Sequence, residues 1–364
     1  PHEVYPADFR CEKLDEGQVK ILRSTGLADL VLPEMARADE LCVARFGRLL
    51  DRKPGIQHGM MYDALVNTLR GAIPAHVPFV RTKVASVATS IDRQELTLAN
   101  GEAISARLVV LAVGLNPGLR HALGLARTEI SHCHSISAGF DIRPVDRTAF
   151  EFPALTYYAE RPTDKAAYLT LFPVPGAMRA NYMCYRGLAD PWILKLRKSP
   201  HAALVEVMPN LEKAIGRFEV AGEMRIRPAD LYVTENYLQP GIVLVGDAFS
   251  TSCPAAGTGA GKVLTDVACL CNTHIPNWLK SAGMDTDKLA AFYADPSKRA
   301  YDAGALDRAF ELRATSIDPG LRWAARRWVR FLGRGGVGIV RRAGERLRLG
   351  PLPGDPRPRT VRHV

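Results

Sequence analysis

Residues 245–262 read VGDAFSTSCPAAGTGAGK, the end of an apolar strand followed by a Gly-Asp turn, a proline and three glycines. The turn places the Asp247 carboxylate at the end of the strand at 241–247, and the glycines mark the start of a helix. Backbone N–H groups at a helix start favour an anionic or strongly polar ligand atom, and small residues let that atom approach closely. Asp247 is able to accept a hydrogen bond from a ligand hydroxyl, such as one of a polyol chain. The stretch therefore predicts a ligand site between a strand and a helix.

The spacing excludes two common phosphate-binding loops. A Walker loop, G-x-x-x-x-G-K-[ST], would need a glycine at 256 and a hydroxyl at 263, where the chain has Ala256 and Val263. The first turn of a Rossmann unit places G-x-G-x-x-G directly after its strand, whereas the Gly-x-Gly here begins ten residues beyond Asp247. From the residues alone, a cofactor site and a glycine-rich helix that only packs against a sheet both remain open.

The stretch resembles the second flavin-binding motif of the FAD-dependent aromatic hydroxylases, the family of p-hydroxybenzoate hydroxylase and the ubiquinone-pathway hydroxylases. That motif has Gly-Asp after a strand, then a proline, a Gly-x-Gly and a second Asp at fixed offsets. The matching residues, spread over 21 positions, are Gly246, Asp247, Pro254, Gly257, Gly259 and Asp266. The resemblance implies that Asp247 binds the ribityl chain of FAD and that the backbone of 257–261 lies near the flavin pyrimidine and the pyrophosphate. Ser250 and Gly261 stand where the family often has His and Asn, which weakens any inference about the substrate.

A second resemblance lies at the apolar run LVVLAV, 108–113, which ends on Gly114. The family's middle motif closes a strand on Ala-x-Gly and has an Arg six residues beyond that Gly; Ala112, Gly114 and Arg120 match it. Val113 stands where one-component hydroxylases usually have Asp. In relatives that Asp-Gly pair serves both FAD and NAD(P)H, so the resemblance leaves two electron routes open: NAD(P)H directly, or a partner flavin reductase.

The N-terminal segment FRCEKLDEGQVKILRSTGL, 9–27, resembles the family segment whose Arg and Gln approach FAD. By that resemblance Arg10 and Gln18 are cofactor-binding residues; the alternative is that both are ordinary surface polar residues. The strand, G-x-G-x-x-G turn, helix and acidic residue that begin the family pattern are not in the sequence as given. We therefore expect the chain to enter the fold after the second strand, with the first βαβ unit absent and, if the chain is complete, poor affinity for FAD.

The resemblance and the order of segments predict an α/β protein, a Rossmann-like flavoprotein fold with an inserted, mainly antiparallel substrate sheet and a helical C-terminus. The predicted helices are 15–25, 60–73, 201–215 with a break at Pro209, and a helical stretch from 257. The predicted strands are 41–46, a meander within 83–113, three segments between 154 and 186, 218–228 and 241–247. The predicted domains are a discontinuous FAD-binding domain (1–130 with 237–300), a substrate domain (131–236), a basic helical region (301–349) and a disordered tail (350–364).

The charge of the chain is concentrated at one end. The sequence has a net charge of +10, and residues 319–364 alone hold twelve Arg against Glu345 and Asp355, so the remainder sums to zero. If 321–334 is helical, its arginines and its apolar residues lie on opposite faces. Such a helix fits an anionic membrane surface, or packs its apolar face on the protein with the arginines in water; we favour the second. A neutral body without a recognised module does not indicate a nucleic-acid binder.

Other features limit the remaining possibilities. Seven scattered cysteines and no long apolar run indicate thiols in a cytoplasmic protein, with peripheral membrane contact as an option. His132 and His134 flank Cys133, but no third ligand has suggestive spacing, so we expect no metal. Five tyrosines fall in the segment that forms the roof of the substrate pocket in the family; more often such residues pack a sheet. They are Tyr157, Tyr158, Tyr168, Tyr182 and Tyr185.

Together these features imply an FAD-dependent monooxygenase that hydroxylates a hydrophobic or aromatic small molecule through a peroxyflavin. Because the cofactor carries that chemistry, no catalytic acid or base is assigned. Two alternatives remain: a flavin-dependent reductase or dehydrogenase acting on an isoprenoid or other apolar substrate, and a truncated, flavin-free interaction or membrane-associated protein.

Overall fold

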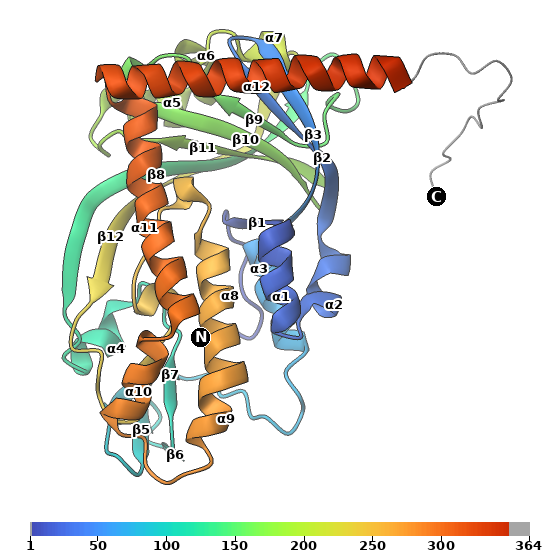
Figure 1. Cartoon of the computed structure of the whole chain (residues 1–364). Coiled ribbons are helices and arrows are strands. Elements are labelled where there is room, and N and C mark those ends of the chain that lie inside the picture. Colours follow the sequence, from blue (N-terminus) through green and yellow to red (C-terminus); the bar gives the residue numbers. More distant parts are fainter. Residues whose placement is uncertain (1, 349–364) are drawn as a thin grey trace, which may run out of the picture.

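The structure, a computed structural model, describes residues 2–348, with side chains described up to residue 341. The tail predicted to be disordered, 350–364, lies outside the described residues. A large curled sheet of eight strands dominates the fold, in the order β1-β3-β2-β9-β10-β11-β8-β12 (Figure 1). Its strands are β1 (Cys11–Asp15), β2 (Ala36–Arg45), β3 (Arg48–Met61), β8 (Arg127–Pro144), β9 (Leu155–Tyr158), β10 (Ala166–Val174), β11 (Ala177–Cys184) and β12 (Phe218–Thr234). All neighbours are antiparallel except β2 and β9, so the sheet is mixed.

One face of this sheet is closed by three short helices, α5 (Pro191–Lys198), α6 (Pro200–Val207) and α7 (Leu211–Ile215). Apolar side chains that alternate along the strands meet the apolar sides of these helices and form the main core. Tyr157 and Tyr182 are fully buried there. These two tyrosines therefore pack the core instead of facing a ligand.

A second unit contains the parallel strands predicted from the apolar runs. β7 (Val109–Leu111) and β13 (Ile242–Leu244) pair in parallel, as the apolar runs predicted. β13 is buried on both faces, but β7 is not, because Val110 is 42% exposed. Beside them lies the predicted meander of β4 (Val84–Ala88), β5 (Gln94–Leu98) and β6 (Ala103–Ala106). Because the two parallel strands run in one direction, Gly114 and Gly246 follow their carboxyl ends at the same edge, where α/β folds bind ligands.

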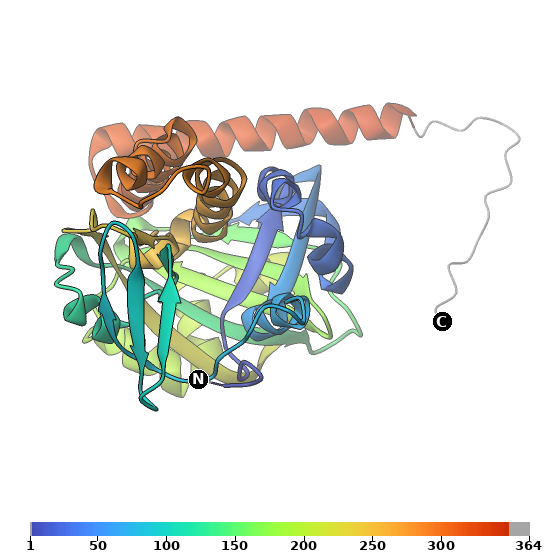
Figure 2. The same cartoon turned by 90° about the horizontal axis from the view of Figure 1, so that it is seen from below.

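Helices cover the other face of the large sheet, as seen in Figure 2. The two long helices of this layer are α8 (Gly259–Cys269) and α11 (Pro296–Ile317). The Lys298 ammonium lies 2.7 Å from a carboxylate oxygen of Asp266, and Lys262 lies 2.7 Å from Asp302, so buried ion pairs join the two helices. The remaining helices of the described chain are α1 (Glu16–Ser24), α2 (Ala28–Val31), α3 (Tyr62–Gly71), α4 (Pro117–Ala122), α9 (Ile275–Trp278), α10 (Thr286–Tyr293) and α12 (Leu321–Arg348), besides short 3₁₀ and π turns.

The last described helix, α12, crosses the top of the molecule in Figure 1. The structure confirms that it is helical and amphipathic, but its orientation is the reverse of the packing that we favoured from the sequence. Leu321 and Leu332 are 89% and 64% exposed, whereas Arg326 and Arg341 pair with acidic residues of the protein body. Within residues 2–348, no helix combines the length and hydrophobicity that a membrane crossing requires.

Candidate functional site

The Gly-Asp turn is held in place by α8. Gly246 has φ +58°, a conformation that favours glycine, and its N–H donates to Asp266 Oδ2 at 2.8 Å. Asp266 is itself fixed by the Lys298 ammonium. The position of Asp247, the next residue, is therefore set by a carboxylate nineteen residues later and by a lysine on α11.

Asp247 lies among charges of both signs. Its partial burial raises the pKa of the carboxyl, and the nearby cations Lys262, Arg10 and Arg127 oppose that rise. Glu12 on β1 is close enough to interact with the Asp247 carboxylate. Its pKa is raised to about 7, mainly by burial and in part by Asp247, while Arg10 opposes the rise. The site thus has one carboxyl that is partly protonated at neutral pH beside a second that has three cations near it.

Gln18 connects the N-terminal segment to the glycine-rich loop. It is buried at the third position of α1, where it forms a reciprocal capping box with Asp15. Its Nε2 donates to the carbonyl oxygen of Gly257 at 3.2 Å. Gly257 has φ +65°, and no described atom lies within 4 Å of the place where its Cβ would stand. The contact joins two predicted cofactor segments that are 239 residues apart.

The start of α8 exposes backbone donors. The N-cap Thr258 makes no side-chain cap, and its hydroxyl is buried without a hydrogen-bond partner among the described residues. Pro254 and Gly259 are exposed on either side of it. The first N–H groups of α8 are therefore not satisfied by a cap, which leaves them available to an anionic or polar ligand atom.

Arg10, which we expected to bind the cofactor, is engaged by neighbouring side chains of the protein. Its guanidinium pairs with Asp8 and lies 4.0 Å from the centre of the Tyr62 ring. It nonetheless contributes to the electrostatics of Asp247. Arg10 is therefore at the site, but a local carboxylate already neutralises part of its charge.

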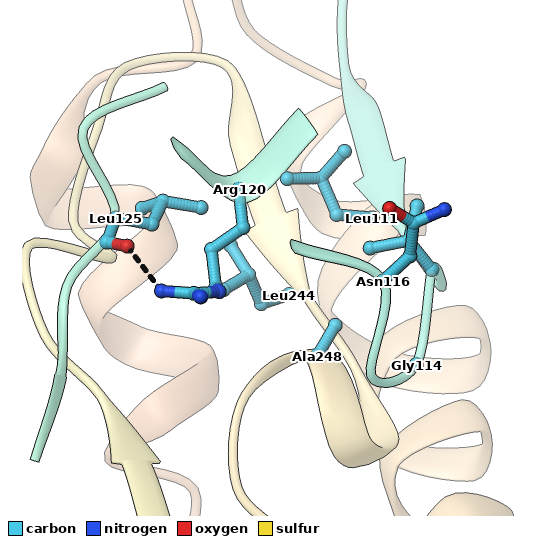
Figure 3. Close-up of a pocket in the computed structure, with 8 residues that line it drawn as sticks. Leu111, Gly114, Asn116, Arg120, Leu125, Leu244 and Ala248 are labelled. Atoms are coloured by element: carbon cyan, nitrogen blue, oxygen red, sulfur yellow. Dashed lines mark hydrogen bonds between the residues drawn. The ribbon is translucent and has the colours of Figure 1, made fainter. Parts of the chain in front are cut away.

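The edge formed by β7 and β13 contains a small cavity (Figure 3). Its volume is about 10 Å³, enough for roughly one water molecule and not for a ring system. Val113, Gly114 and Arg120 line it, and Arg120 donates to the carbonyl oxygen of Leu125 at 2.9 Å. The Nε atom of Arg120 is buried without a partner among the described residues. The middle motif therefore brings an arginine with spare hydrogen-bonding capacity next to the Gly-Asp turn.

Arg127 and Tyr232 are site residues that the sequence did not reveal. The Arg127 guanidinium lies 3.7 Å from the centre of the Tyr232 ring, and two of its nitrogens are buried without a partner in the described chain. The Tyr232 hydroxyl donates to the backbone carbonyl of Asp247 at 3.1 Å. Neither residue belongs to a spaced motif; they reach the site because β8 and β12 pair along their whole length.

The helix-covered face of the large sheet carries polar groups towards the glycine-rich loop. The Tyr168 hydroxyl donates to the carbonyl oxygen of Ala255. Asn181 on β11 donates to Cys11 Sγ on β1 at 3.3 Å. Tyr168 thus hydrogen-bonds the loop following Asp247, and Tyr185 packs in the same apolar cluster as Cys253 and Ala255 of that loop.

The histidines that flank Cys133 point to different surroundings. His134 is fully buried and its Nε2 lies 3.3 Å from the carbonyl oxygen of Ala309, whereas His132 is exposed beside Asp230. Within the described residues no three metal-binding side chains gather.

Comparisons with known proteins agree with this architecture. No protein-family model matches the chain. A curated relative, 3-demethoxyubiquinol 3-hydroxylase of Escherichia coli K12, is 30% identical over 228 residues, which cover 57% of this chain and 51% of that protein. The chain thus spans about half the length of this relative.

Solved structures show the same fold at low sequence identity. The crystal structure of p-nitrophenol 4-monooxygenase PnpA from Pseudomonas putida matches 91% of this chain and 84% of its own, with a TM-score of 0.67 and 14% identity. The structure of Klebsiella pneumoniae HpxO complexed with FAD and uric acid matches 95% of this chain and 89% of the HpxO chain, with a TM-score of 0.63 and 14% identity. The predicted resemblance is confirmed: the chain has the fold of the FAD-dependent aromatic hydroxylases.

Proposed function

We propose that this chain, which has the aromatic-hydroxylase fold, is an FAD-dependent monooxygenase that hydroxylates a hydrophobic or aromatic small molecule. The observation that supports this best is the hydrogen bond from Gln18 to the Gly257 carbonyl beside the Asp247 turn. It brings together two segments, 9–27 and 245–262, that were predicted separately as parts of one flavin site. The curated hydroxylase relative points to the same type of reaction.

The residues present fit FAD. Asp247 offers carboxylate oxygens to ribityl hydroxyls, and the uncapped start of α8 offers N–H groups to a polar or anionic part of the cofactor. Gly114 and Gly257 both have positive φ and open space where a Cβ would stand. When bound, FAD supplies the oxygen-transfer chemistry, and the protein supplies binding, orientation and exclusion of water.

The protein groups around the site have separate tasks in this proposal. With its pKa raised to about 7, Glu12 is only partly ionised at neutral pH and so adds less than a full second charge beside Asp247. The Tyr168 and Asn181 side chains orient the substrate on the sheet. In domain terms, residues 1–130 and 237–300 hold the cofactor and 131–236 provide most of the substrate surface.

The electron donor is a second part of the proposal. Val113 lines the cavity beside Gly114 at a position where its side chain offers no hydrogen bond to a nicotinamide or flavin. We therefore propose that a partner flavin reductase supplies the electrons, with direct use of NAD(P)H as the alternative. A reductase or dehydrogenase acting on an apolar substrate would share this binding site.

The test is a spectroscopic one on the purified full chain. We expect added FAD to give a bound-flavin absorption band, and the bound flavin to be reduced by NADPH only when a flavin reductase is present. Under air, reoxidation with a phenolic substrate should release a hydroxylated product. Absence of a flavin band would contradict the enzyme assignment. Reduction by NADPH alone would contradict only the partner reductase, and reoxidation without product would favour the dehydrogenase.

A further inference from the structure

The helix α12 is attached to the protein mainly by its arginines. Arg326 and Arg330 both bind the carboxylate of Glu311 on α11. Arg341 lies towards the C-terminal end of α12 and is half-buried. Its Nη1 atom is 2.8 Å from Asp51 Oδ1 on β3. In an ordinary surface helix the apolar face would be packed and the charged face would be in water. Here the charged face makes the attachment.

Backbone proximity and two aromatic contacts complete the inner side of α12. Gly338 is buried, and a Cβ at this position would stand 1.9 Å from the carbonyl oxygen of Leu50. Phe331 packs edge-on against Phe46, with ring centres 5.4 Å apart, and the half-exposed Trp328 stacks on the same ring at 6.5 Å. The helix is thus closely seated on β3 and on the turn before it, and its rotation about its own axis is fixed.

The opposite side of α12 is apolar and exposed. Val329 precedes Gly338 by nine residues. At 100° per residue, this spacing puts the two residues on opposite sides of the helix. Val329 is 69% exposed, Leu332 64%, Ile339 64% and Val340 72%. Ala325 and Gly336 fill the positions between them. We call Val329, Leu332, Ile339 and Val340 the outer stripe.

We propose that the outer stripe is a membrane-docking surface, with α12 lying in the plane of an anionic bilayer. A helix that presents aliphatic side chains on one side, with arginines along its flank and tryptophan at its edge, binds at the boundary between lipid headgroups and acyl chains. Arg322 is exposed beside Trp323, and Trp328, at the edge of the stripe, is 56% exposed. Guanidinium groups and indole rings are the side chains that anchor such helices at the interface.

Charge favours lipid over protein as the occupant. The α12 segment, 321–348, holds nine Arg against one Glu, a net charge of +8 out of +10 for the whole chain, so attraction to an anionic surface is concentrated on this helix. A second copy of the chain docked on the same stripe would bring two such segments together, which like-charge repulsion opposes. The proposal is independent of the enzymatic assignment, because it rests on α12 alone.

Vesicle binding by the full chain tests the proposal. We expect the wild-type protein to co-sediment with vesicles of phosphatidylcholine and phosphatidylglycerol, more weakly with phosphatidylcholine alone, and less as the salt concentration rises. Val329→Glu/Leu332→Glu should lower the partition coefficient at least about tenfold, because two charges would enter the acyl boundary. Ile104→Glu/Ile130→Glu adds the same charge at exposed sites on β6 and β8 and should bind nearly as well as wild type.

Two further measurements keep the outcome decisive. Trp192 and Trp278 are buried, so quenching of tryptophan fluorescence by brominated acyl chains would report on Trp323 and Trp328. Circular dichroism and thermal melts should show that the variants remain folded, since the altered side chains are exposed. Equal vesicle binding by wild type and the stripe variant would overturn the proposal. The proposal would also be overturned if the wild type does not bind vesicles but forms a dimer, and the stripe variant is a monomer.

Discussion

At the residue scale, the pair of carboxyl groups formed by Glu12 and Asp247 makes the candidate site respond to pH. Burial raises the pKa of Glu12 from its usual 4.5 to about 7, and the Asp247 carboxylate adds to the rise. The folded protein therefore holds the Glu12 proton more tightly than the unfolded chain does. Glu12 destabilises the folded protein least below about pH 4.5, where it is protonated in both states. The free energy of unfolding then falls as the pH rises from there through 7.

We predict that Glu12→Gln stabilises the FAD-free protein at pH 8 but not at pH 4. The shift of the pKa corresponds to at most about 3 kcal/mol at pH 8. Urea unfolding at the two pH values measures the difference. Glu219→Gln, at an exposed position on β12, is the matched substitution and should change stability by less than about 0.5 kcal/mol at either pH. A Glu12→Gln effect that does not change with pH would contradict the prediction.

Gly261 illustrates a residue whose role the motif did not reveal. A Cβ at this position would stand 1.8 Å from the Tyr301 hydroxyl oxygen, because α11 crosses α8 closely there. We predict that Gly261→Ala lowers the free energy of unfolding by about 1–3 kcal/mol through overpacking. In a Tyr301→Ala background the same change should be neutral or stabilising, since alanine is the better helix former. Chemical denaturation of the four proteins gives the double-mutant cycle, and an equal cost in both backgrounds would contradict the steric explanation.

The candidate site could be predicted from the sequence only where its residues belong to a local motif or to a segment that resembles one. The spacing of Gly246, Asp247 and Gly257 is local, and it led to the flavin motif. Glu12, Arg127 and Tyr232 lie far apart in the chain and carry no spacing signal. They converge because β1, β8 and β12 belong to one curled sheet, and pairing of that kind is tertiary information.

At the element scale, β3 shows where local propensity failed. The segment RLLDRKPGIQHGMM contains Pro54, Gly55 and several charges, so it does not predict a strand. It becomes a fourteen-residue strand because β1 and β2 pair with it on both sides. The helices with clear periodicity or start signals, α1, α3 and α8, were predicted within a few residues, as was the break between α6 and α7 at Pro209.

The junction between α8 and α11 leads to a prediction about elements. Asp266 and Lys298 are each 1% exposed, and their pair ties the two helices to the Gly246 turn. Asp266→Ala leaves the buried Lys298 with Asp302 as its remaining carboxylate partner, and we expect it to cost about 3–5 kcal/mol of stability. Glu223→Gln removes the partner of Arg225 in an exposed pair and should cost less than about 1 kcal/mol. Thermal and denaturant unfolding measure both, and similar small losses would show that the buried cluster does not join the helices.

At the scale of the whole molecule, the sequence pattern of α12 was compatible with two opposite packings. Its arginines and aliphatic residues separate onto two faces either way, so periodicity alone does not say which face is inside. The positions of Glu311 and Asp51 decide it, since they bind the arginines from two different parts of the body. The fold class was predictable because one motif identified it, whereas the placement of this helix depended on partners 15 and 290 residues away.

Binding of FAD to the chain should couple the whole molecule to the site. A ligand that binds only the folded state adds about 2.7 kcal/mol of stability at one hundred times its dissociation constant. We therefore predict that FAD raises the melting temperature of the wild-type protein by several degrees. Asp247→Ala should remove most of that increase, because it deletes the carboxylate that faces the ribityl chain in our proposal. Gln18→Leu should reduce it, because the loop at Gly257 loses its anchor.

The matched variant for this test is Asp92→Ala, which removes an exposed carboxylate from the turn before β5. It should retain the full increase in melting temperature with FAD. If Asp247→Ala also retains the increase, FAD binds elsewhere or through the backbone alone, and the assignment of Asp247 is wrong. If wild type shows no increase at any FAD concentration, the gathering of Gln18, Gly257 and Asp247 is structural only. Because the readout is stability, it separates loss of cofactor binding from loss of turnover.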